Sequence, residues 1–379
     1  MKILEEQIES CRTTYNYLLN HCKEKYKEKS KIPTQFDLNN HLPALKKTRP
    51  ELTKVHSQVL QNLSKRITDA YNNFYARRKA GLKAGFPRFK KLDRYRSISY
   101  PQSGYKIRGN YLELSKIGRI KMKLHRPIEG KIKTLNIKRA PSGKWFACFS
   151  CVIEAKTRDK AIEDAGIDVG IDRFAVLSNG TFIENPRYLR QSERRLSRLQ
   201  RSMSRKKKGS HNWVKAKVKL ARLHEKISNS RDDFLHKTSR SIAEKYHVVY
   251  VEDLNIRNLV KNRHLAKSIS DASWGRFIRM VAYKEEESGG QLIFVNPRNT
   301  SQLCSQCGKM VEKPLSERMH KCPRCGLVMD RDLNASRNIL KIGRGPPESE
   351  PAESMTSTLP LRIEQVNSVS QETSLKARE

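Results

Sequence analysis

The sequence predicts a multidomain α+β protein, and three observations indicate this class. Apolar residues recur every three or four positions over much of the first hundred residues, which is the period of a helix that buries one face. Between about Ser97 and Glu154 the period changes to two, as in antiparallel strands. From Ala165 onward, short apolar strand-like runs are separated by charged helical segments, and two Cys-x-x-Cys pairs follow.

The composition indicates a protein that binds nucleic acid. Of the 379 residues, 77 are Lys or Arg and only 39 are Asp or Glu, so the formal net charge is +38. Such an excess repels itself unless a polyanion neutralises it. No apolar run approaches the roughly 18 residues of a membrane span, and no secretory signal is evident. We therefore expect no membrane partner and a cytoplasmic protein that associates with the nucleoid through DNA.

The first 96 residues are predicted to form two packed helices separated by a Pro-containing loop. Each helix has one apolar stripe, formed by Leu4, Ile8, Cys11, Tyr15, Leu18 and Cys22 in the first and by Val55, Val59, Leu63, Ile67, Tyr71 and Phe74 in the second.

A basic segment from Arg77 to Lys91 follows the second helix, and Gly and Pro residues interrupt it. Phe86 and Phe89 alternate with its cations, as in segments that contact a nucleic-acid backbone. We predict phosphate contacts here, and the alternative is a solvated basic loop. The predicted contacts are Arg77, Arg78, Lys79, Lys83, Arg88, Lys90 and Lys91.

The next segment, 97–160, is predicted to form an antiparallel, barrel-like β domain. Ile120, Met122 and Leu124 alternate with lysines, which is the period of a strand with one buried face. A Pro-Ser-Gly turn then precedes a β-branched and aromatic run from Trp145 to Ile153.

An α/β unit is predicted from Ala165 onward, and acidic residues at three places mark a candidate site in it. Asp168 lies within the first strand, on the opposite face from its apolar neighbours. Glu252 ends a buried-type strand, where ligands of open α/β sheets collect. Asp330 and Asp332 stand at the start of a predicted helix, directly after the second cysteine pair.

One acid from each of these three segments suits a site that cleaves phosphodiesters with two magnesium ions, because carboxylates can hold both ions about 3.5 to 4 Å apart. Each acid also has a purely structural interpretation: Asp168 in a turn, Glu252 at an exposed strand end and Asp332 as a helix cap. The individual residues leave these alternatives open, and their order and context favour the joint interpretation.

Between the first two acids lies the strongest concentration of positive charge. The segment Arg194 to Lys226 holds thirteen Lys or Arg and a single acid, and Gly209-Ser210 is predicted to divide it into two helices. The alternative to nucleic-acid binding is a solvated helical face. The predicted contacts are Arg194, Arg195, Arg198, Arg201, Arg205, Lys206, Lys207 and Lys208.

Four of the eight cysteines have the spacing of metal ligands. Two Cys-x-x-Cys pairs are separated by fourteen residues, and four thiolates bind zinc tetrahedrally without an open position for water. The predicted zinc site is therefore structural, with the ligands Cys304, Cys307, Cys322 and Cys325. The other cysteines are expected in hydrophobic cores rather than in disulfides: Cys11, Cys22, Cys148 and Cys151.

Five stretches of the chain resemble signatures of the TnpB (OrfB) family of insertion-sequence proteins, compact relatives of the type V CRISPR effectors. The resemblance covers most of residues 1–340. The stretches are Gly166-Ile-Asp-Val-Gly170, Val251-Glu-Asp-Leu254, Leu265-Ala-Lys-Ser-Ile-Ser-Asp-Ala-Ser-Trp274, Asn299-Thr-Ser-Gln302 and Asp330-Arg-Asp-Leu-Asn-Ala335.

The resemblance implies an RNase H-like (RuvC) α/β nuclease domain with an inserted zinc ribbon. It also implies a transposon-derived guide RNA that directs magnesium-dependent cutting of target DNA next to a short flanking motif. Carried over by motif, Asp168, Glu252 and Asp332 would be the catalytic acids and the magnesium ligands. Asp332 is preferred over Asp330 because the family acid stands two residues before an Asn-Ala pair, here Asn334-Ala335.

Motifs and composition together divide the chain into predicted segments. Family members usually open with a basic strand, whereas this chain reaches its first helix almost at once, so its β domain is expected to lack one strand. The segments are a helical recognition-like region (1–96), a wedge-like β-barrel domain (97–160), a RuvC-like nuclease domain (161–300) with a basic helical insertion (190–228), a zinc ribbon (301–328), a C-terminal RuvC-like segment (329–344) and a disordered tail (345–379).

Two alternatives to a guided endonuclease stay open. One is an RNA-guided DNA-binding regulator without cleavage, which relatives reach by losing catalytic acids, but this chain retains all three. The other is an unguided, transposase-like zinc-ribbon protein that binds DNA. The spread of basic charge over every predicted domain favours a large structured RNA as a partner over this second alternative.

Overall fold

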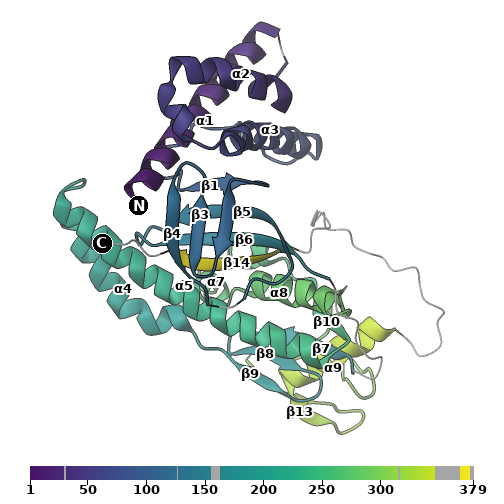
Figure 1. The fold of residues 1–379 in the computed structure, drawn as a ribbon. Coiled ribbons are helices and arrows are strands. Elements are labelled where there is room, and N and C mark those ends of the chain that lie inside the picture. The colour runs from purple at the N-terminus through teal and green to yellow at the C-terminus, as the bar shows by residue number, and fades with distance from the viewer. Residues whose placement is uncertain (30, 126, 155–162, 315, 346–367, 376–379) are drawn as a thin grey trace. The chain divides into compact units, whose positions relative to one another are not determined.

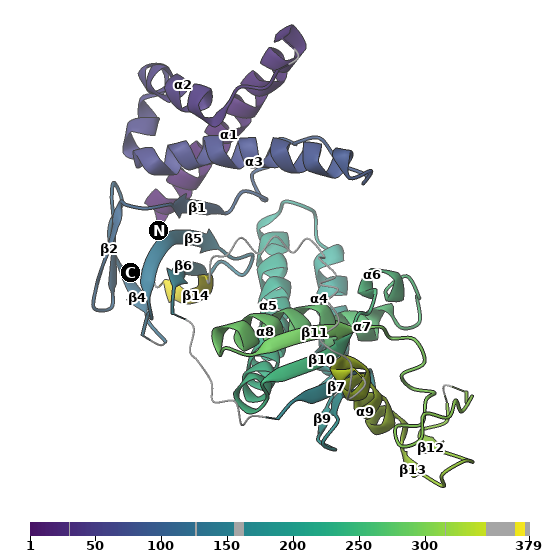
Figure 2. The ribbon, with the colours of Figure 1, turned by 90° about the vertical axis from the view of Figure 1, so that its right-hand side faces the viewer.

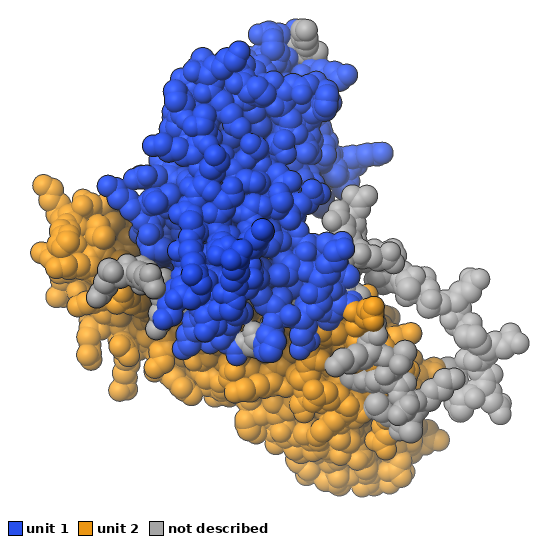
Figure 3. All heavy atoms as spheres, viewed as in Figure 1, with its two compact units in different colours: residues 1–153, 364–379 blue, residues 154–363 orange. Residues whose placement is uncertain are grey.

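The structure, a computed structural model, describes residues 1–29, 31–125, 127–154, 163–314, 316–345 and 368–375 (Figure 1). The chain divides into two compact units (Figure 3): Met1–Ile153 with Glu364–Glu379, and Glu154–Ile363. Each unit contains both helices and strands, so the predicted multidomain fold of mixed helices and strands is confirmed. In the described ranges, no helix has the length and apolar character needed to cross a membrane.

The first unit opens with the helices α1 (Lys2–Lys29), α2 (Gln35–Thr48) and α3 (Ser57–Lys79), with a short 3-10 helix η1 (Pro50–Lys54) before α3. All residues of the two predicted apolar stripes are buried except Phe74.

The prediction of a loop between the two N-terminal helices is wrong, because α2 forms there. A capping box begins this helix: the Asp37 N–H donates to Thr34 Oγ1 at 3.2 Å, and the Thr34 N–H donates to Asp37 Oδ2 at 2.8 Å. Leu38, Leu42 and Leu45 then supply a buried stripe. Burial of this stripe outweighs the helix-breaking tendency of Pro43, which lies inside the helix.

Six strands follow in the first unit: β1 (Ser97–Tyr100), β2 (Tyr105–Arg108), β3 (Tyr111–Leu114), β4 (Gly118–Lys123), β5 (Lys131–Arg139) and β6 (Trp145–Val152). They pair antiparallel, as predicted. The described strands form an open seven-stranded sheet in the order β1-β5-β6-β14-β4-β3-β2, so the prediction of a barrel-like closure is wrong. Closure would require pairing between the two edge strands, β1 and β2, and neither has a second partner among the described residues.

The seventh strand, β14 (Ser368–Leu375), comes from the C-terminal tail. It pairs antiparallel with β6 from Ser368 opposite Val152 to Leu375 opposite Trp145, and it also pairs with the end of β4. For this strand the prediction of a disordered tail is wrong; the rest of that tail after Gly345 lies outside the described residues. A strand joins a sheet through its backbone N–H and C=O groups, so a polar composition does not exclude it.

The core assignment of the four other cysteines is confirmed at three positions. Cys11, Cys22 and Cys151 are buried in the hydrophobic core that the helices and the sheet of the first unit share. Cys148 is only partly buried. It lies on the other face of β6 from the buried residues Ala147 and Phe149, because successive side chains of a strand alternate between faces.

The second unit contains a five-stranded sheet in the order β11-β10-β7-β8-β9 (Figure 2). β7, β8 and β9 are antiparallel, and β10 is parallel to both β7 and β11. The turn at Asn179-Gly180 leads into β9 as predicted, with Gly180 at φ +91°. The strands are β7 (Ala165–Val169), β8 (Arg173–Leu177), β9 (Phe182–Glu184), β10 (Val248–Glu252) and β11 (Gln291–Val295).

Helices lie on both faces of this sheet. On one face, α5 and α8 share a core with the side chains of Ile167, Val249 and Val251. On the other face, α9 packs against Tyr250 of β10 through its residue Ile339. The helices of this unit are α4 (Tyr188–Ser204), α5 (His211–Lys245), α6 (Ile256–Leu259), α7 (Ala266–Ala272), α8 (Trp274–Glu287) and α9 (Arg331–Arg344).

The close approach of α9 to the sheet depends on two glycines. A Cβ atom on Gly166 of β7 would lie 2.2 Å from the Ser336 carbonyl oxygen of α9, and one on Gly343 of α9 would lie 2.0 Å from the Tyr250 ring. Real Cβ atoms do not approach heavy atoms this closely, so any other residue would push α9 away. The middle and end of α9 thus lie directly against β7 and β10, and Asp332 at its start is near enough to Asp168 for their charges to interact.

Candidate active site and metal centre

Two acidic side chains lie side by side on one face of the five-stranded sheet. Val251 of β10 lies opposite Ile167 of β7, so the next residues along these parallel strands, Glu252 and Asp168, are neighbours. Side chains alternate between the faces of a strand. Because Val251 and Ile167 face α5 and α8, Glu252 and Asp168 are on the face that α9 covers.

The start of α9 carries the third and fourth acidic residues. Asp330 is the N-cap: its Oδ1 accepts hydrogen bonds from the N–H of Asp332 at 2.9 Å and of Leu333 at 3.2 Å. Asp330 also forms an ion pair with Arg173 of β8 at 2.7 Å. The cap of α9 is therefore Asp330, and the capping alternative considered for Asp332 is wrong.

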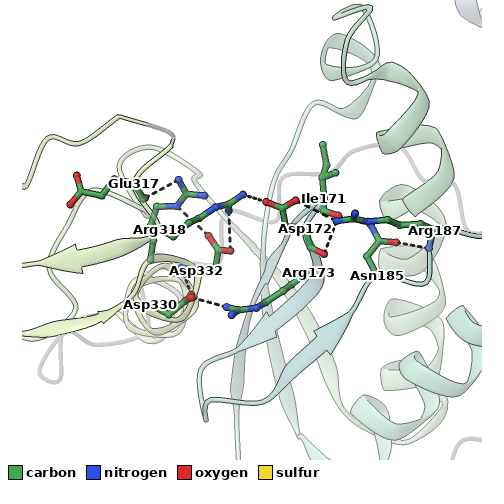
Figure 4. Close-up of polar contacts among 10 residues, drawn as sticks. Ile171, Asp172, Arg173, Asn185, Arg187, Glu317, Arg318, Asp330 and Asp332 are labelled. Carbon is green, nitrogen blue, oxygen red and sulfur yellow. Dashed lines mark hydrogen bonds and ion pairs between the residues drawn. The ribbon is translucent and has the colours of Figure 1, made fainter. Parts of the chain in front are cut away.

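Arginines surround Asp332, as Figure 4 shows for Arg318. The Nε atom of Arg331 lies 3.2 Å from Asp332 Oδ1, and Nη1 of Arg318 lies 3.6 Å from Asp332 Oδ2. Arg318 also forms an ion pair with Asp172, which lies between β7 and β8. The guanidinium groups compensate the negative charge that Asp332 brings to the two strand carboxylates.

The three acids interact electrostatically. Burial raises the pKa of Asp168 well above its ordinary value, and the negative charges of Glu252 and Asp332 raise it further. Burial also raises the pKa of Glu252, while a hydrogen bond from Thr300 lowers it. Desolvated carboxylates repel one another when all are ionised, and a divalent cation between them would remove that repulsion.

The donor set fits magnesium, a hard cation that prefers carboxylate oxygens. The carboxylate oxygens of the three acids are not all within 4.8 Å of one another, a spacing that only the four predicted zinc ligands reach among the described residues. The three acids therefore stand farther apart than the ligands of a single preformed metal cage.

The four predicted zinc ligands form one compact cluster in the structure. The Sγ atoms of Cys304 and Cys325 are 3.6 Å apart, and those of Cys307 and Cys322 are 3.5 Å apart. A tetrahedral zinc with Zn–S bonds of about 2.3 Å holds its sulfurs about 3.8 Å apart. The sulfur positions therefore fit such an ion with a small expansion.

Both cysteine pairs adopt the same backbone turn. The Gly308 N–H donates to the Cys304 carbonyl at 2.9 Å, and the Gly326 N–H donates to the Cys322 carbonyl at 3.0 Å. Both glycines have φ +72°, a conformation that favours glycine. The backbone N–H groups of Cys325 and Arg324 lower the pKa of the Cys322 thiol, whereas burial and the neighbouring thiols raise the pKa of Cys325, as expected of four sulfurs held close together.

The predicted basic contacts of the first unit lie at the end of α3 and in the segment after it. From Arg77 to Lys91 all of these cations are exposed except Lys90, whose ammonium lies 5.6 Å from the centre of the Tyr15 ring. Phe86 makes edge contacts with aromatic rings of α3, so it anchors the segment, while Phe89 is the more exposed ring. The segment is therefore anchored to the helices through Phe86 and exposes most of its cations to solvent.

The predicted basic contacts of the second unit lie on α4 and in the turn after it. α4 packs against α5 through a small core that includes Leu196, Leu223 and Ile227. The predicted contacts from Arg194 to Lys208 are exposed except Lys206, which is partly buried. The helix pair therefore buries its apolar stripe and presents its cations to solvent.

Several polar residues of the site were not predicted from the sequence as site residues. Thr300 donates a hydrogen bond to Glu252, and the α9 residues Asn334 and Asn338 hold the segment that leads to Cys304. The spacing of the two asparagines could have indicated their role. They are four residues apart in the sequence and therefore lie on one face of α9, the face that is otherwise buried. Arg318 has no comparable signal, because its partner Asp332 is brought near it only by the fold.

Taken together, the fold and the site define a basic, multidomain protein of mixed helices and strands, with clustered acids at a sheet and a separate four-cysteine cluster. Two family models match the chain: OrfB of IS605, described as "Probable transposase", over residues 149–263, and the Cas12f1-like TNB domain over residues 274–339. The fold is similar to that of Cas12f1 in its complex with sgRNA and target DNA, with a TM-score of 0.56, 17% identity and coverage of 89% of this chain and 82% of that one.

Sequence relatives identify the family. A "Putative RNA-guided DNA endonuclease" of Streptomyces pristinaespiralis is 38% identical over 298 residues, which cover 77% of this chain and 73% of the relative. InsQ of Escherichia coli, which has the same description, is 32% identical and covers 80% of this chain and 81% of the relative. The chain belongs to the TnpB (OrfB) family, as its motifs predicted.

Proposed function

We propose that this protein is an RNA-guided, magnesium-dependent DNA endonuclease of an insertion sequence, which cuts DNA next to a short flanking motif. The observation that carries the proposal is the placement of Asp168 and Glu252 on adjacent parallel strands, with Asp332 above them at the start of α9. The names of the two relatives support the same activity.

The sheet of the second unit supports an RNase H-like (RuvC) assignment. Three antiparallel strands come first along the chain, and two parallel strands follow on the other side of β7, giving the order β9-β8-β7-β10-β11. In open α/β sheets, ligands bind beyond the carboxyl ends of the strands. The strands β7 and β10, which are the first and fourth of this sheet along the chain, carry the two strand acids of the proposed site.

In the proposed mechanism, Asp168, Glu252 and Asp332 would hold the magnesium ions. When bound, magnesium supplies an activated water and stabilises the leaving oxygen. The carboxylates orient the ions and carry no sequence information, so the choice of target would come from base pairing with the guide RNA. The four cysteines would hold a structural zinc that fixes the segment before α9.

The cations on the end of α3 and on α4 are proposed contacts for the guide RNA or the target strand. Phosphate contacts supply affinity and orientation without reading sequence. The exposed lysines and arginines at the end of α3 and on α4 can make such contacts, because each helix is fixed in place by a hydrophobic core.

The experiment that tests the proposed function starts from the purified protein with the RNA that accompanies it. Sequencing this RNA defines the guide, and a DNA library with a matching target and randomised flanking bases is then offered with magnesium. We expect cutting of the matched DNA only, with a requirement for particular flanking bases. Cutting that ignores the guide sequence would contradict guided cleavage.

The lysines in the turn after α4 give a first testable prediction. Changing Lys207 and Lys208 to Ala should lower affinity for the accompanying RNA and flatten the dependence of log affinity on log salt by about 0.7 to 0.9 per lost phosphate contact. Affinity measured by filter binding across a salt series checks this. The matched control changes Lys237 and Lys245, two exposed lysines of α5 outside the predicted contacts. A salt slope for the Lys207 and Lys208 variant that equals that of the unchanged protein would show that this turn is only a solvated surface.

The two acids at the start of α9 give a second prediction. Asp330→Asn keeps an oxygen that can cap the helix, so it should retain much of the cleavage activity. Asp332→Asn should lose it, because an amide replaces a charged metal ligand. Cleavage rates under identical conditions check the pair, and melting temperatures show whether the cap is intact. Strong cutting by Asp332→Asn together with none by Asp330→Asn would reverse the assignment.

A further inference from the structure

Thr300 contacts one of the proposed metal ligands directly. It is 3% exposed and lies in the segment between β11 and the first cysteine pair. Its hydroxyl oxygen lies 2.5 Å from Glu252 Oε1 and 3.2 Å from the Pro297 carbonyl oxygen. A hydroxyl has one proton to donate, and a carboxylate at the shorter distance is the stronger acceptor. The hydroxyl therefore donates to Glu252.

The position of Thr300 is set by a tight turn and by α9. Asn299 has φ +64°, and its carbonyl accepts hydrogen bonds from the N–H of Gln302 and of Leu303, both at 3.0 Å. Asparagine is among the few residues that adopt this conformation readily. The Nδ2 group of Asn338 donates to the Thr300 carbonyl at 2.8 Å and to the Leu303 carbonyl at 2.7 Å.

The same helix also holds the first cysteine of the cluster from both sides. Asn334 donates from Nδ2 to the Leu303 carbonyl at 2.7 Å, and its Oδ1 accepts from the Ser305 N–H at 2.8 Å. Cys304 lies between these two residues. Asn334 is two residues after Asp332, so one helix carries a proposed metal ligand, grips the cysteine cluster and holds the carbonyl of Thr300.

We propose that Thr300 is a positioning residue that orients Glu252 for metal binding, and that Asn338 of α9 holds Thr300 in place. The inference rests on the proposed function above. A hydrogen bond to Oε1 fixes the rotation of the carboxylate and would leave Oε2 available as a metal ligand. Partners that orient a metal ligand change metal affinity or activity by about 10- to 100-fold when they are removed.

This arrangement also means that α9 positions two of the proposed metal ligands at once. Asp332 and the carbonyl contact to Thr300 belong to one rigid helix, and Glu252 belongs to β10. A shift of α9 would therefore move Asp332 and release the orientation of Glu252 together. The cysteine cluster, to which α9 is bonded through Asn334 and Asn338, therefore helps to fix the positions of both Asp332 and Glu252.

The test compares Thr300→Val, which keeps the shape but removes the donor, with Thr300→Ser, which keeps the donor. Thr300→Val should raise the magnesium concentration for half-maximal cleavage by about 10- to 100-fold, and Thr300→Ser should stay close to the unchanged protein. The matched control is Ser301→Ala, which removes the neighbouring, partly buried hydroxyl, for which the described residues show no hydrogen bond. Guided DNA binding should be the same in all three variants.

A second readout does not depend on cleavage. Manganese binding to the guide-bound protein, followed by the loss of the free Mn²⁺ signal in electron paramagnetic resonance, should weaken in Thr300→Val. The guide RNA also binds Mn²⁺. The Mn²⁺ binding measured for the guide-bound Glu252→Gln variant is therefore subtracted from that of each other protein. In the Glu252→Gln background, adding Thr300→Val should have no further effect, since Thr300 acts through Glu252.

Each outcome decides the inference. Unchanged Mn²⁺ binding by Thr300→Val, or an equal additional loss in the Glu252→Gln background, would overturn it. Failure of Thr300→Ser to restore binding would do the same. If Thr300→Val loses guide binding or its melting transition, Thr300→Ala provides a second donor-free variant. A protein that binds Mn²⁺ as expected but never cuts guided DNA would refute the proposed function and leave the positioning role supported.

Discussion

Changing Asp168 to Ala should reduce guided DNA cleavage by about three orders of magnitude or more. Metal ions supply several kcal/mol of transition-state stabilisation in phosphodiester cleavage, and about 1.4 kcal/mol corresponds to each factor of ten in rate. Asp168 is the central acid of the proposed site: it is partly buried, and the charges of both Glu252 and Asp332 act on it. Its loss removes the ligand that the other two acids surround.

The measurement is the single-turnover rate of cutting with saturating guide-bound protein, together with the affinity for matched DNA. Affinity should be unchanged, because base pairing and phosphate contacts supply it. The control is Asp233→Ala, which removes an exposed carboxylate of α5 that pairs only with Lys237 in the described structure. Robust cutting by Asp168→Ala would overturn the metal-dependent mechanism.

The effects of the three acids should not add. Glu252→Ala and Asp332→Ala are each expected to disable cleavage as strongly as Asp168→Ala, and a double variant should be little worse than either single one. Residues that act as one unit show this behaviour, because the loss of any member already removes the joint effect. Clearly additive losses would indicate that the acids act in separate steps.

The second large effect concerns the cysteine cluster. Changing Cys322 to Ser should remove bound zinc and abolish cleavage together. Structural zinc contributes on the order of 10 kcal/mol to the folding of isolated zinc-finger peptides, so the segment around the cluster should lose most of its stability. Since α9 grips the residues on both sides of Cys304, disorder there should also displace Asp332 at the start of α9.

Metal analysis checks this expectation. The unchanged protein should contain about one equivalent of zinc, with the Cys322→Ser variant well below half. The matched control is Cys148→Ser, a partly buried cysteine of β6 outside the cluster, which should keep both zinc and activity. Folded, active protein without zinc would contradict the assignment of the four cysteines.

Local patterns of the sequence predicted many of the elements. The apolar stripes of α1 and α3, the alternation in the β strands and the Asn-Gly turn before β9 depend on neighbouring residues, and the structure agrees with each of them. The cysteine cluster was predictable for the same reason, since two Cys-x-x-Cys pairs can close around one ion wherever the segment folds.

The errors of the prediction have long-range causes. α2 contains a proline, yet three leucines buried against the rest of the first unit stabilise it. Strand β14 has a polar composition, and only the positions of β6 and β4 make its backbone pairing possible. Whether the sheet closes into a barrel depends on how its edge strands meet, which no local pattern specifies.

The amino-acid sequence alone shows which residue types are available for chemistry and in what order: a strand acid, a second strand acid, a zinc-type cysteine pattern and an acidic helix start. The tertiary structure decided which of them act on one another. The register of β7 and β10 makes Asp168 and Glu252 neighbours, and the packing of α9 on the sheet brings Asp332 near enough for its charge to act on Asp168. It also decided that Asp330 caps the helix, because a cap depends on the direction of the backbone, which composition does not encode. Thr300 contacts Glu252 only because the fold brings together two residues that are far apart in the sequence.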